Sequence, residues 1–141
     1  MSLSSATAVQ ESSEIRRILV PTDRPLRVGV LVSGGGTTLV NFVREKLAGR
    51  LPVDFPLVIA SRPDCGGIAR AAAAGIPCEV VARKSFTSVA TFSAEVFSRL
   101  RAARVDLVAL AGFLSLLEIP ADYRDRVLNI HPSLIPAFCG K

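Results

Sequence analysis

The chain has 141 residues, of which 50% are hydrophobic and 21% are charged, which suits one folded domain or a large part of one rather than a disordered segment. Its net charge of +5 comes from scattered basic residues with few aromatics between them, so we expect no nucleic-acid partner. The longest nearly apolar run, residues 107–117, is shorter than the roughly 20 residues of a membrane-spanning helix. No basic stretch followed by an apolar run opens the given sequence, so a secretory signal is not expected, and we expect a cytoplasmic protein without a membrane partner.

Regular patterns begin after a polar, serine-rich stretch. We expect residues 1–25 to form a poorly ordered arm and residues 26–141 to form the domain. Short β-branched apolar runs predict strands, and apolar residues spaced three and four apart predict helices. In chain order we predict a strand at 28–32, a helix opened by a Thr37 or Thr38 cap and stopped by Gly49, a strand at 57–60, a helix at 68–74, a strand at 78–81, a helix at 89–100, a strand at 107–111, a short helix or turn at 120–126 and a strand at 127–130.

Strands that alternate with helices predict an α/β fold with a mostly parallel, Rossmann-like sheet and helices on both faces. Ligands bind such sheets beyond the carboxyl ends of the strands. Three of these ends carry distinctive residues, namely 33–36, 112–117 and 129–131. We therefore expect the functional site where these three segments meet.

The first of these segments is a glycine turn. Gly35, Gly36, Thr37 and Thr38 leave room for an anion next to the free amides and the positive dipole end of the following helix. The segment is not a P-loop, and Leu39 stands where the dinucleotide fingerprint needs Gly or Ala. These residues predict a monophosphate site, and a tight turn without a ligand is the alternative.

The third segment reads Asn129-Ile130-His131-Pro132. Asn129 and His131 are two residues apart on extended chain, so their side chains point the same way. An amide that donates to an oxyanion and an imidazole that moves a proton suit acyl-transfer chemistry. The alternative is a turn asparagine beside a structural histidine.

The three cysteines are widely spaced, and the chain has one histidine. No Cys-x-x-Cys pair occurs, so neither a zinc site nor a disulfide framework is indicated. We expect reduced structural thiols and no metal.

Three segments, Arg27 to Leu39, Leu107 to Leu114 and Leu128 to Pro136, carry a resemblance to the folate-dependent formyltransferase family, and in particular to its phosphoribosylglycinamide formyltransferases. The resemblance implies the formyltransferase fold, of which this chain would hold the N-terminal portion. It implies transfer of a formyl group from 10-formyltetrahydrofolate, as co-substrate, to the amine of 5'-phosphoribosylglycinamide in de novo purine biosynthesis. A monomer or homodimer acting on small molecules is expected.

The resemblance also implies roles for individual residues. Asn129 and His131 would be catalytic, and residues 35–38 would hold the substrate phosphate. The residues that would contact the folate are Leu114, Ser115, Leu116, Leu117, Val89 and Asn129.

The sequence departs from this family in several places. Arginines that contact the folate tail in well-known members are replaced by Val89 and Ser115, and asparagines common in the turn are replaced by Gly35 and Thr38. Members also carry a downstream aspartate that orients the histidine. We expect that aspartate to be missing, so that the 141-residue chain alone is inactive or very slow. A formyltetrahydrofolate deformylase and a non-catalytic binder of a phosphoribosyl ligand remain alternatives.

Overall fold

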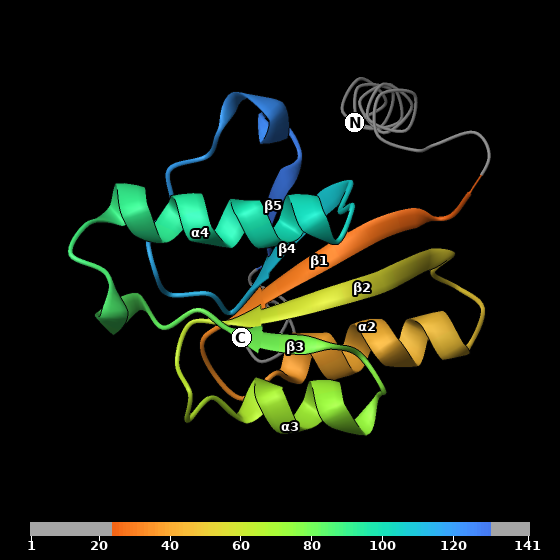
Figure 1. Ribbon diagram of the computed structural model, residues 1–141. Helices are drawn as coiled ribbons and strands as arrows, with labels where there is room; N and C mark the ends of the chain where they lie inside the picture. Colours follow the sequence, from red (N-terminus) through yellow and green to blue (C-terminus); the bar gives the residue numbers. More distant parts are fainter. Residues whose placement is uncertain (1–23, 131–141) are drawn as a thin grey trace, which may run out of the picture.

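The computed structural model describes residues 24–130, which form one sheet with helices on both faces (Figure 1). The strands are β1 (Leu26–Val32), β2 (Val53–Ala60), β3 (Cys78–Val80), β4 (Leu107–Ala111) and β5 (Val127–Ile130). The α-helices are α2 (Thr37–Leu47), α3 (Gly66–Ala73) and α4 (Val89–Ala102). Two short 3-10 segments complete the described chain, η1 (Arg83–Ser85) and η2 (Ala121–Tyr123).

The five strands are parallel and lie in the order β3-β2-β1-β4-β5. The chain builds outward from β1 through β2 to β3, and then returns to place β4 on the other side of β1. The order of the strands therefore reverses between β1 and β4, which is the position where open α/β sheets bind their ligands. This topology confirms the predicted mostly parallel, Rossmann-like fold.

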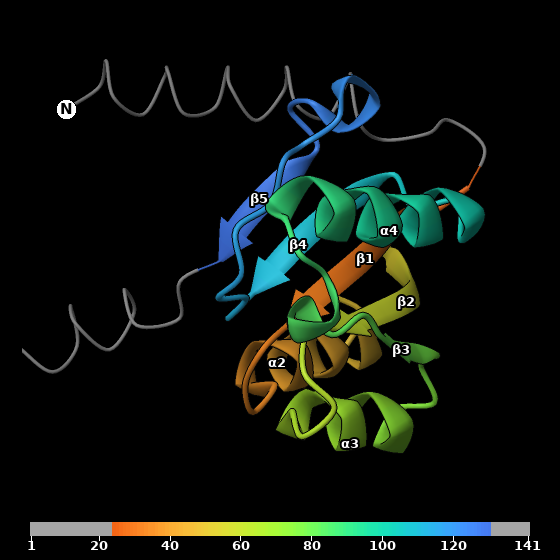
Figure 2. The ribbon, with the colours of Figure 1, turned by 60° about the vertical axis from the view of Figure 1, so that its left-hand side comes forward.

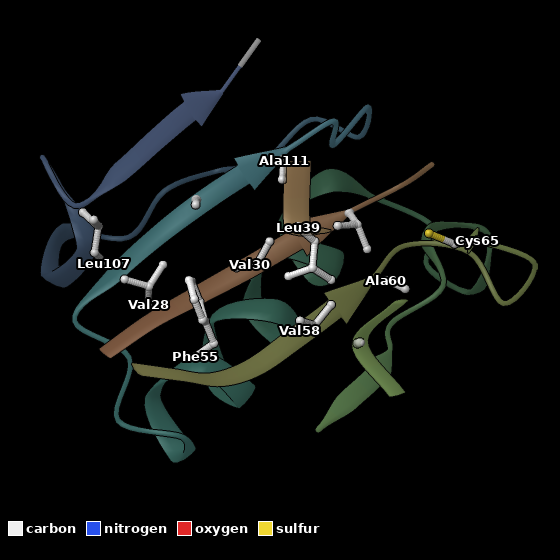
Figure 3. Packing of buried hydrophobic residues seen from close by; sticks show 12 residues of the cluster. Val28, Val30, Leu39, Phe55, Val58, Ala60, Cys65, Leu107 and Ala111 are labelled. Carbon is white, nitrogen blue, oxygen red and sulfur yellow. The ribbon is translucent and has the colours of Figure 1, made fainter. Parts of the chain in front are cut away.

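Helices α2 and α3 cover one face of the sheet and α4 covers the other (Figure 1). Alternate residues of β1 explain this layering, because successive side chains of a strand point to opposite faces. Val28 and Val30 belong to the core beneath α2 and α3 (Figure 3), whereas Leu31 packs under α4. A Cβ atom on Gly29 would lie 2.7 Å from a methyl carbon of Leu100, so glycine here lets α4 approach the sheet.

Most predicted elements are confirmed, several with ends shifted by one to three residues, and three further details differ. Strand β2 begins four residues earlier than predicted, at Val53, and the segment η1 was not predicted. The expected threonine cap of α2 is wrong, because the N-cap residue is Gly36 and no side chain bonds there. Gly36 has φ 84°, a left-handed conformation that glycine adopts without strain, and this conformation turns the chain directly into the helix.

Residues 1–23, most of the expected arm, lie outside the described range. Arg24 lies inside it, and its guanidinium donates to both carboxylate oxygens of Asp106, at 2.7 and 2.9 Å. The amide of Arg27 donates to the same carboxylate at 2.9 Å. Asp106 therefore connects the start of β1 to the start of β4. None of the helices between residues 24 and 130 combines the length and the apolar character that crossing a bilayer requires.

Candidate active site at the carboxyl ends of β1 and β4

Ser33, the residue after β1, joins the loops that follow three strands. Its side chain is buried, and its hydroxyl accepts a hydrogen bond from the amide of Leu114 at 3.0 Å and lies 2.6 Å from the hydroxyl of Ser61. Its amide donates to the carbonyl of Gly112 at 3.3 Å. Because these bonds fix the loops relative to one another, the point where the strand order reverses has a defined shape.

The glycine turn packs tightly against the start of α3. The carbonyl of Gly34 accepts hydrogen bonds from the amide of Gly67 at 3.0 Å and from the thiol of Cys65 at 2.8 Å. A Cβ atom on Gly36 would lie 2.8 Å from the Cα of Gly67. The fold itself therefore requires glycine at position 36, whatever binds nearby.

Gly34 and Gly35 differ from Gly36 in this respect. A Cβ atom at either position would meet no atom within 4 Å, and neither residue has a positive φ. Neither packing nor backbone conformation demands glycine at these two positions. Bare backbone that faces open space is the arrangement that lets an anion approach main-chain amides closely.

The amino end of α2 lies next to this open backbone. The first backbone hydrogen bond of the helix runs from the amide of Val40 to the carbonyl of Gly36, at 3.0 Å, so the amides of Thr37, Thr38 and Leu39 come before it. The first turn holds no acidic residue, while the last turn holds Arg44 and Lys46. The positive end of the helix dipole is thus left uncompensated at the glycine turn, where it favours an anion.

The loop after β4 exposes apolar side chains next to the turn. Leu114 and Leu116 are 82% and 75% exposed, whereas Leu117 packs against the core beneath α4. Leu114 and Ser115 also line a cavity together with Ser33. Exposed leucines at a predicted ligand edge suit a flat, partly apolar ligand. Val89 begins α4 and is half-buried.

Asn129 lies in β5 with Leu110 of β4 as its register partner. Its side chain is exposed, one residue before the carboxyl end of the strand. It points to the same face as Val127, which packs against the core beneath α4. His131 lies outside the described residues, so its pairing with Asn129 stays a prediction.

Four residues that line a cavity at this edge were not singled out in the sequence, namely Ser61, Arg62, Arg83 and Lys84. They line a cavity of about 240 Å³ with Ser33, Leu114 and Ser115. Each of the four comes soon after β2 or β3, at the same edge of the sheet as the glycine turn. Every strand end of a parallel sheet meets the ligand edge, so considering the ends of β2 and β3 as well would have found them.

Within residues 24–130, no three histidine, cysteine, aspartate or glutamate side chains gather in a way that suits a metal ion. Two free cysteines lie in this range, Cys65 and Cys78. Burial raises the pKa of the Cys78 thiol, and the nearby Cys65 and Glu79 raise it further. A thiol with a raised pKa is a poor nucleophile at neutral pH.

The family model described as "Formyl transferase" matches residues 26–141. The chain belongs to the formyl transferase family. A phosphoribosylglycinamide formyltransferase of Haemophilus influenzae is 34% identical to it over 116 residues, which cover 81% of this chain and 55% of that protein. A trifunctional purine biosynthetic protein adenosine-3 of Drosophila melanogaster is 41% identical over 135 residues, which cover 92% of this chain and 10% of that protein.

Solved structures agree with this family membership. The crystal structure of glycinamide ribonucleotide transformylase 1 from Symbiobacterium toebii is 39% identical, with a TM-score of 0.74, and the match covers 83% of this chain and 56% of that one. A phosphoribosylglycinamide formyltransferase from Brucella melitensis is 36% identical, with a TM-score of 0.73, over 82% of this chain and 61% of that one. The chain therefore spans a little over half the length of the Haemophilus influenzae relative and of these two solved structures, and a tenth of the Drosophila protein.

Proposed function

We propose that this chain contributes to the transfer of a formyl group from 10-formyltetrahydrofolate to the amine of 5'-phosphoribosylglycinamide in purine biosynthesis. The observation that carries the proposal is the open backbone of Gly34 and Gly35 in front of the uncapped amino end of α2. It offers amides to a monophosphate at the point where the strand order reverses. The exposed Leu114 and Leu116 offer an apolar surface to a folate ring nearby.

Each residue of the turn would contribute to phosphate binding in a different way. The amides of Thr37 and Thr38 and the exposed hydroxyl of Thr37 would donate to the phosphate oxygens, together with the backbone of Gly35. Thr38 is buried, so its contribution would come mainly from its amide. Gly36 would act by its conformation, because its left-handed φ of 84° sets the direction in which α2 begins.

In the proposed reaction the substrate amine attacks the formyl carbon, a new C–N bond forms and the carbonyl oxygen becomes an oxyanion. The bond to N10 of the folate then breaks, the amine nitrogen loses a proton and N10 gains one. The side-chain NH₂ of Asn129 would donate to the oxyanion, and His131 would assist the proton movement. A preorganised donor of this kind typically stabilises the transition state more than the ground state.

The two alternatives predict different products. A deformylase would hydrolyse 10-formyltetrahydrofolate whether or not the ribonucleotide is present, and a non-catalytic binder would release no tetrahydrofolate. The experiment joins residues 26–141 to the remaining C-terminal part of the Haemophilus influenzae relative and follows tetrahydrofolate release with and without phosphoribosylglycinamide. We expect release only with the ribonucleotide, together with formylated product. Ribonucleotide-independent release, or none at all from a folded chimera, would refute the proposal.

The 141-residue chain is assayed beside the chimera. We expect it to be at least about 100-fold slower, because proton transfer by a positioned partner contributes on the order of 10²- to 10⁴-fold. Equal initial rates would mean that the downstream aspartate expected from the family resemblance is dispensable.

A further inference from the structure

Arg70 of α3 packs its side chain against the glycine turn. A Cβ atom built on Gly36 would lie 3.1 Å from the Cγ atom of Arg70 and 3.5 Å from its Cβ atom, so the stem of this arginine lies against the N-cap residue of α2. Helices α2 and α3 lie side by side on one face of the sheet (Figures 1 and 2). A basic side chain from a separate helix thus reaches the turn that carries the proposed phosphate amides.

The first two residues of α3 leave room for this side chain. Gly66 and Gly67 come four and three residues before Arg70, on the preceding turn, toward which helical side chains lean. Because glycine has no side chain, nothing from that turn competes with the stem of Arg70 for the space beside Gly36. A Cβ atom on Gly66 would lie 3.2 Å from the Cα atom of Gly35. The Arg70 side chain therefore leans toward the open part of the turn.

The charge of Arg70 has no partner in the part of the chain that the structure describes. Arg70 is exposed and makes neither an ion pair nor a side-chain hydrogen bond with any residue between 24 and 130. The first turns of α2 and α3 hold no acidic residue. Beyond the Cγ atom, three more bonds of about 1.5 Å each carry the guanidinium outward from Gly36. It can therefore reach an anion that is held on the neighbouring amides.

The charge of a phosphate monoester is larger than the helix end alone can balance. Such a group carries about −1.5 to −2 charges at pH 7, whereas the amino end of a helix offers the equivalent of about +0.5. The amides of the turn thus leave more than half of the phosphate charge uncompensated. A guanidinium presents its N–H donors in a rigid fork that matches phosphate oxygens. An arginine beside the turn supplies both the missing charge and additional donors.

We propose that Arg70 binds the phosphate of the ribonucleotide and makes the site selective for a phosphorylated substrate. The inference rests on the proposed function, and it extends the phosphate site from residues 35–38 to a second helix. Backbone amides donate to neutral acceptors as well as to anions, so the turn alone discriminates weakly against an unphosphorylated ligand. A full positive charge adds this discrimination. Arg70 therefore contributes to substrate affinity and specificity, and it takes no part in bond formation at the formyl carbon.

The test measures dissociation constants of the 141-residue chain by titration calorimetry. The ligands are phosphoribosylglycinamide, ribosylglycinamide, which lacks the phosphate, and tetrahydrofolate. Arg70→Met removes the charge but keeps an unbranched stem against Gly36, and Arg70→Lys keeps the charge. Arg44→Met is the matched control, because Arg44 is also exposed, lies in the last turn of its helix as Arg70 does, and makes no ion pair within residues 24–130. Thermal unfolding checks that each variant folds.

We expect Arg70→Met to weaken phosphoribosylglycinamide binding by about 10- to 100-fold, the effect of losing a hydrogen bond to a charged group. Binding of ribosylglycinamide and of tetrahydrofolate should stay unchanged, as should every affinity of Arg44→Met. Arg70→Lys should recover part of the ribonucleotide affinity. In the chimera with the Haemophilus influenzae relative, Arg70→Met should raise KM for the ribonucleotide by a similar factor and leave kcat nearly unchanged, because the phosphate contact is the same in the ground state and the transition state.

Equal ribonucleotide affinities of Arg70→Met and Arg44→Met would overturn the assignment of Arg70 and leave the proposed function standing. An equal loss of tetrahydrofolate affinity in Arg70→Met would also overturn it, because Arg70 would then act through the fold of the whole sheet edge. A folded wild-type chain that binds no ribonucleotide, together with a folded chimera that forms no formylated product, would overturn the proposed function itself.

Discussion

The hydroxyls of Ser33 and Ser61 lie 2.6 Å apart at the carboxyl ends of β1 and β2. Both side chains are buried, and the Ser33 hydroxyl also accepts the hydrogen bond from the amide of Leu114. Since that oxygen accepts from Leu114, its own proton is free to go to Ser61. One buried hydroxyl pair thus connects the glycine turn, the loop after β2 and the loop that exposes Leu114.

The first prediction concerns this pair. Ser33→Ala leaves the Leu114 amide without its acceptor and should lower the free energy of unfolding by about 1–3 kcal/mol. It should also weaken folate binding, because the loop of Leu114 loses its anchor. Ser93→Ala is the control, since buried Ser93 accepts from the amide of Glu118 at 2.8 Å further along the same loop. Denaturant unfolding and folate titration together check this, and equal folate affinity in the two variants would contradict it.

The second prediction separates the roles of two glycines. Gly35→Val should weaken phosphoribosylglycinamide binding at least about tenfold with little change in stability, because the side chain would point into open space. Gly36→Val should instead destabilise the protein by about 1–3 kcal/mol, the cost of a strained backbone, with an added clash against Gly67. Calorimetric titration and thermal unfolding of both variants give the comparison. A Gly35→Val protein with full ribonucleotide affinity would remove the turn from the proposed phosphate site.

The third prediction concerns Asn129. In the chimera with the Haemophilus influenzae relative, Asn129→Ala should reduce turnover by about 100- to 1,000-fold, as expected for the loss of one oxyanion donor. The Asn129 side chain is exposed, so the unfolding midpoint should hardly move. Leu128→Ala, on the neighbouring and 43% exposed residue, is the control and should keep most of the rate. Full activity of the Asn129→Ala chimera would show that Asn129 is not the oxyanion donor.

The fourth prediction tests the connection at the other end of the sheet. Burial of Asp106 opposes its ionisation, but hydrogen bonds from Arg24 and from the Arg27 amide outweigh it and lower the pKa of this carboxyl. The stability gained from the charged form is therefore full above the unfolded pKa near ~3.9 and is lost as the pH falls below it. Asp106→Asn should cost about 2 kcal/mol at pH 7.

This cost should shrink as the pH falls below the unfolded pKa near ~3.9, because the carboxyl then takes up a proton in the unfolded chain before it does so in the folded protein. Urea unfolding of both proteins between pH 7 and pH 3 measures the difference. A cost that is the same at pH 7 and at pH 3 would show that charge on Asp106 is not what stabilises the connection.

Short apolar runs in the sequence were enough to predict individual strands. β5 occupies the predicted residues 127–130, and β4 occupies the predicted residues 107–111. Strand order was beyond such patterns, because the placement of β4 beside β1 depends on packing between distant residues. The Ser33–Ser61 pair follows from that order, and so does the convergence of Arg62, Arg83 and Lys84 on one cavity.

The sequence located the glycine turn but could not assign a role to each glycine in it. Neighbouring glycines that look alike in the sequence have different roles in the structure. Gly36 is required by its φ of 84° and by its approach to Gly67, while Gly35 faces open space. The backbone conformation of Gly36 and its contact with α3, which comes from a separate part of the chain, distinguish the two residues.

The central claim is that two substrate sites lie side by side at the carboxyl ends of β1 and β4. Its most direct measurement is the change in amide NMR signals of the isotope-labelled 141-residue chain on separate addition of phosphoribosylglycinamide and of tetrahydropteroyl-triglutamate. We predict that the ribonucleotide shifts the signals of Gly35, Thr37 and Thr38, and that the folate shifts those of Leu114, Ser115 and Leu116. Shifts confined to one shared set of residues for both ligands, or no shift in either set at saturating ligand, would contradict the account.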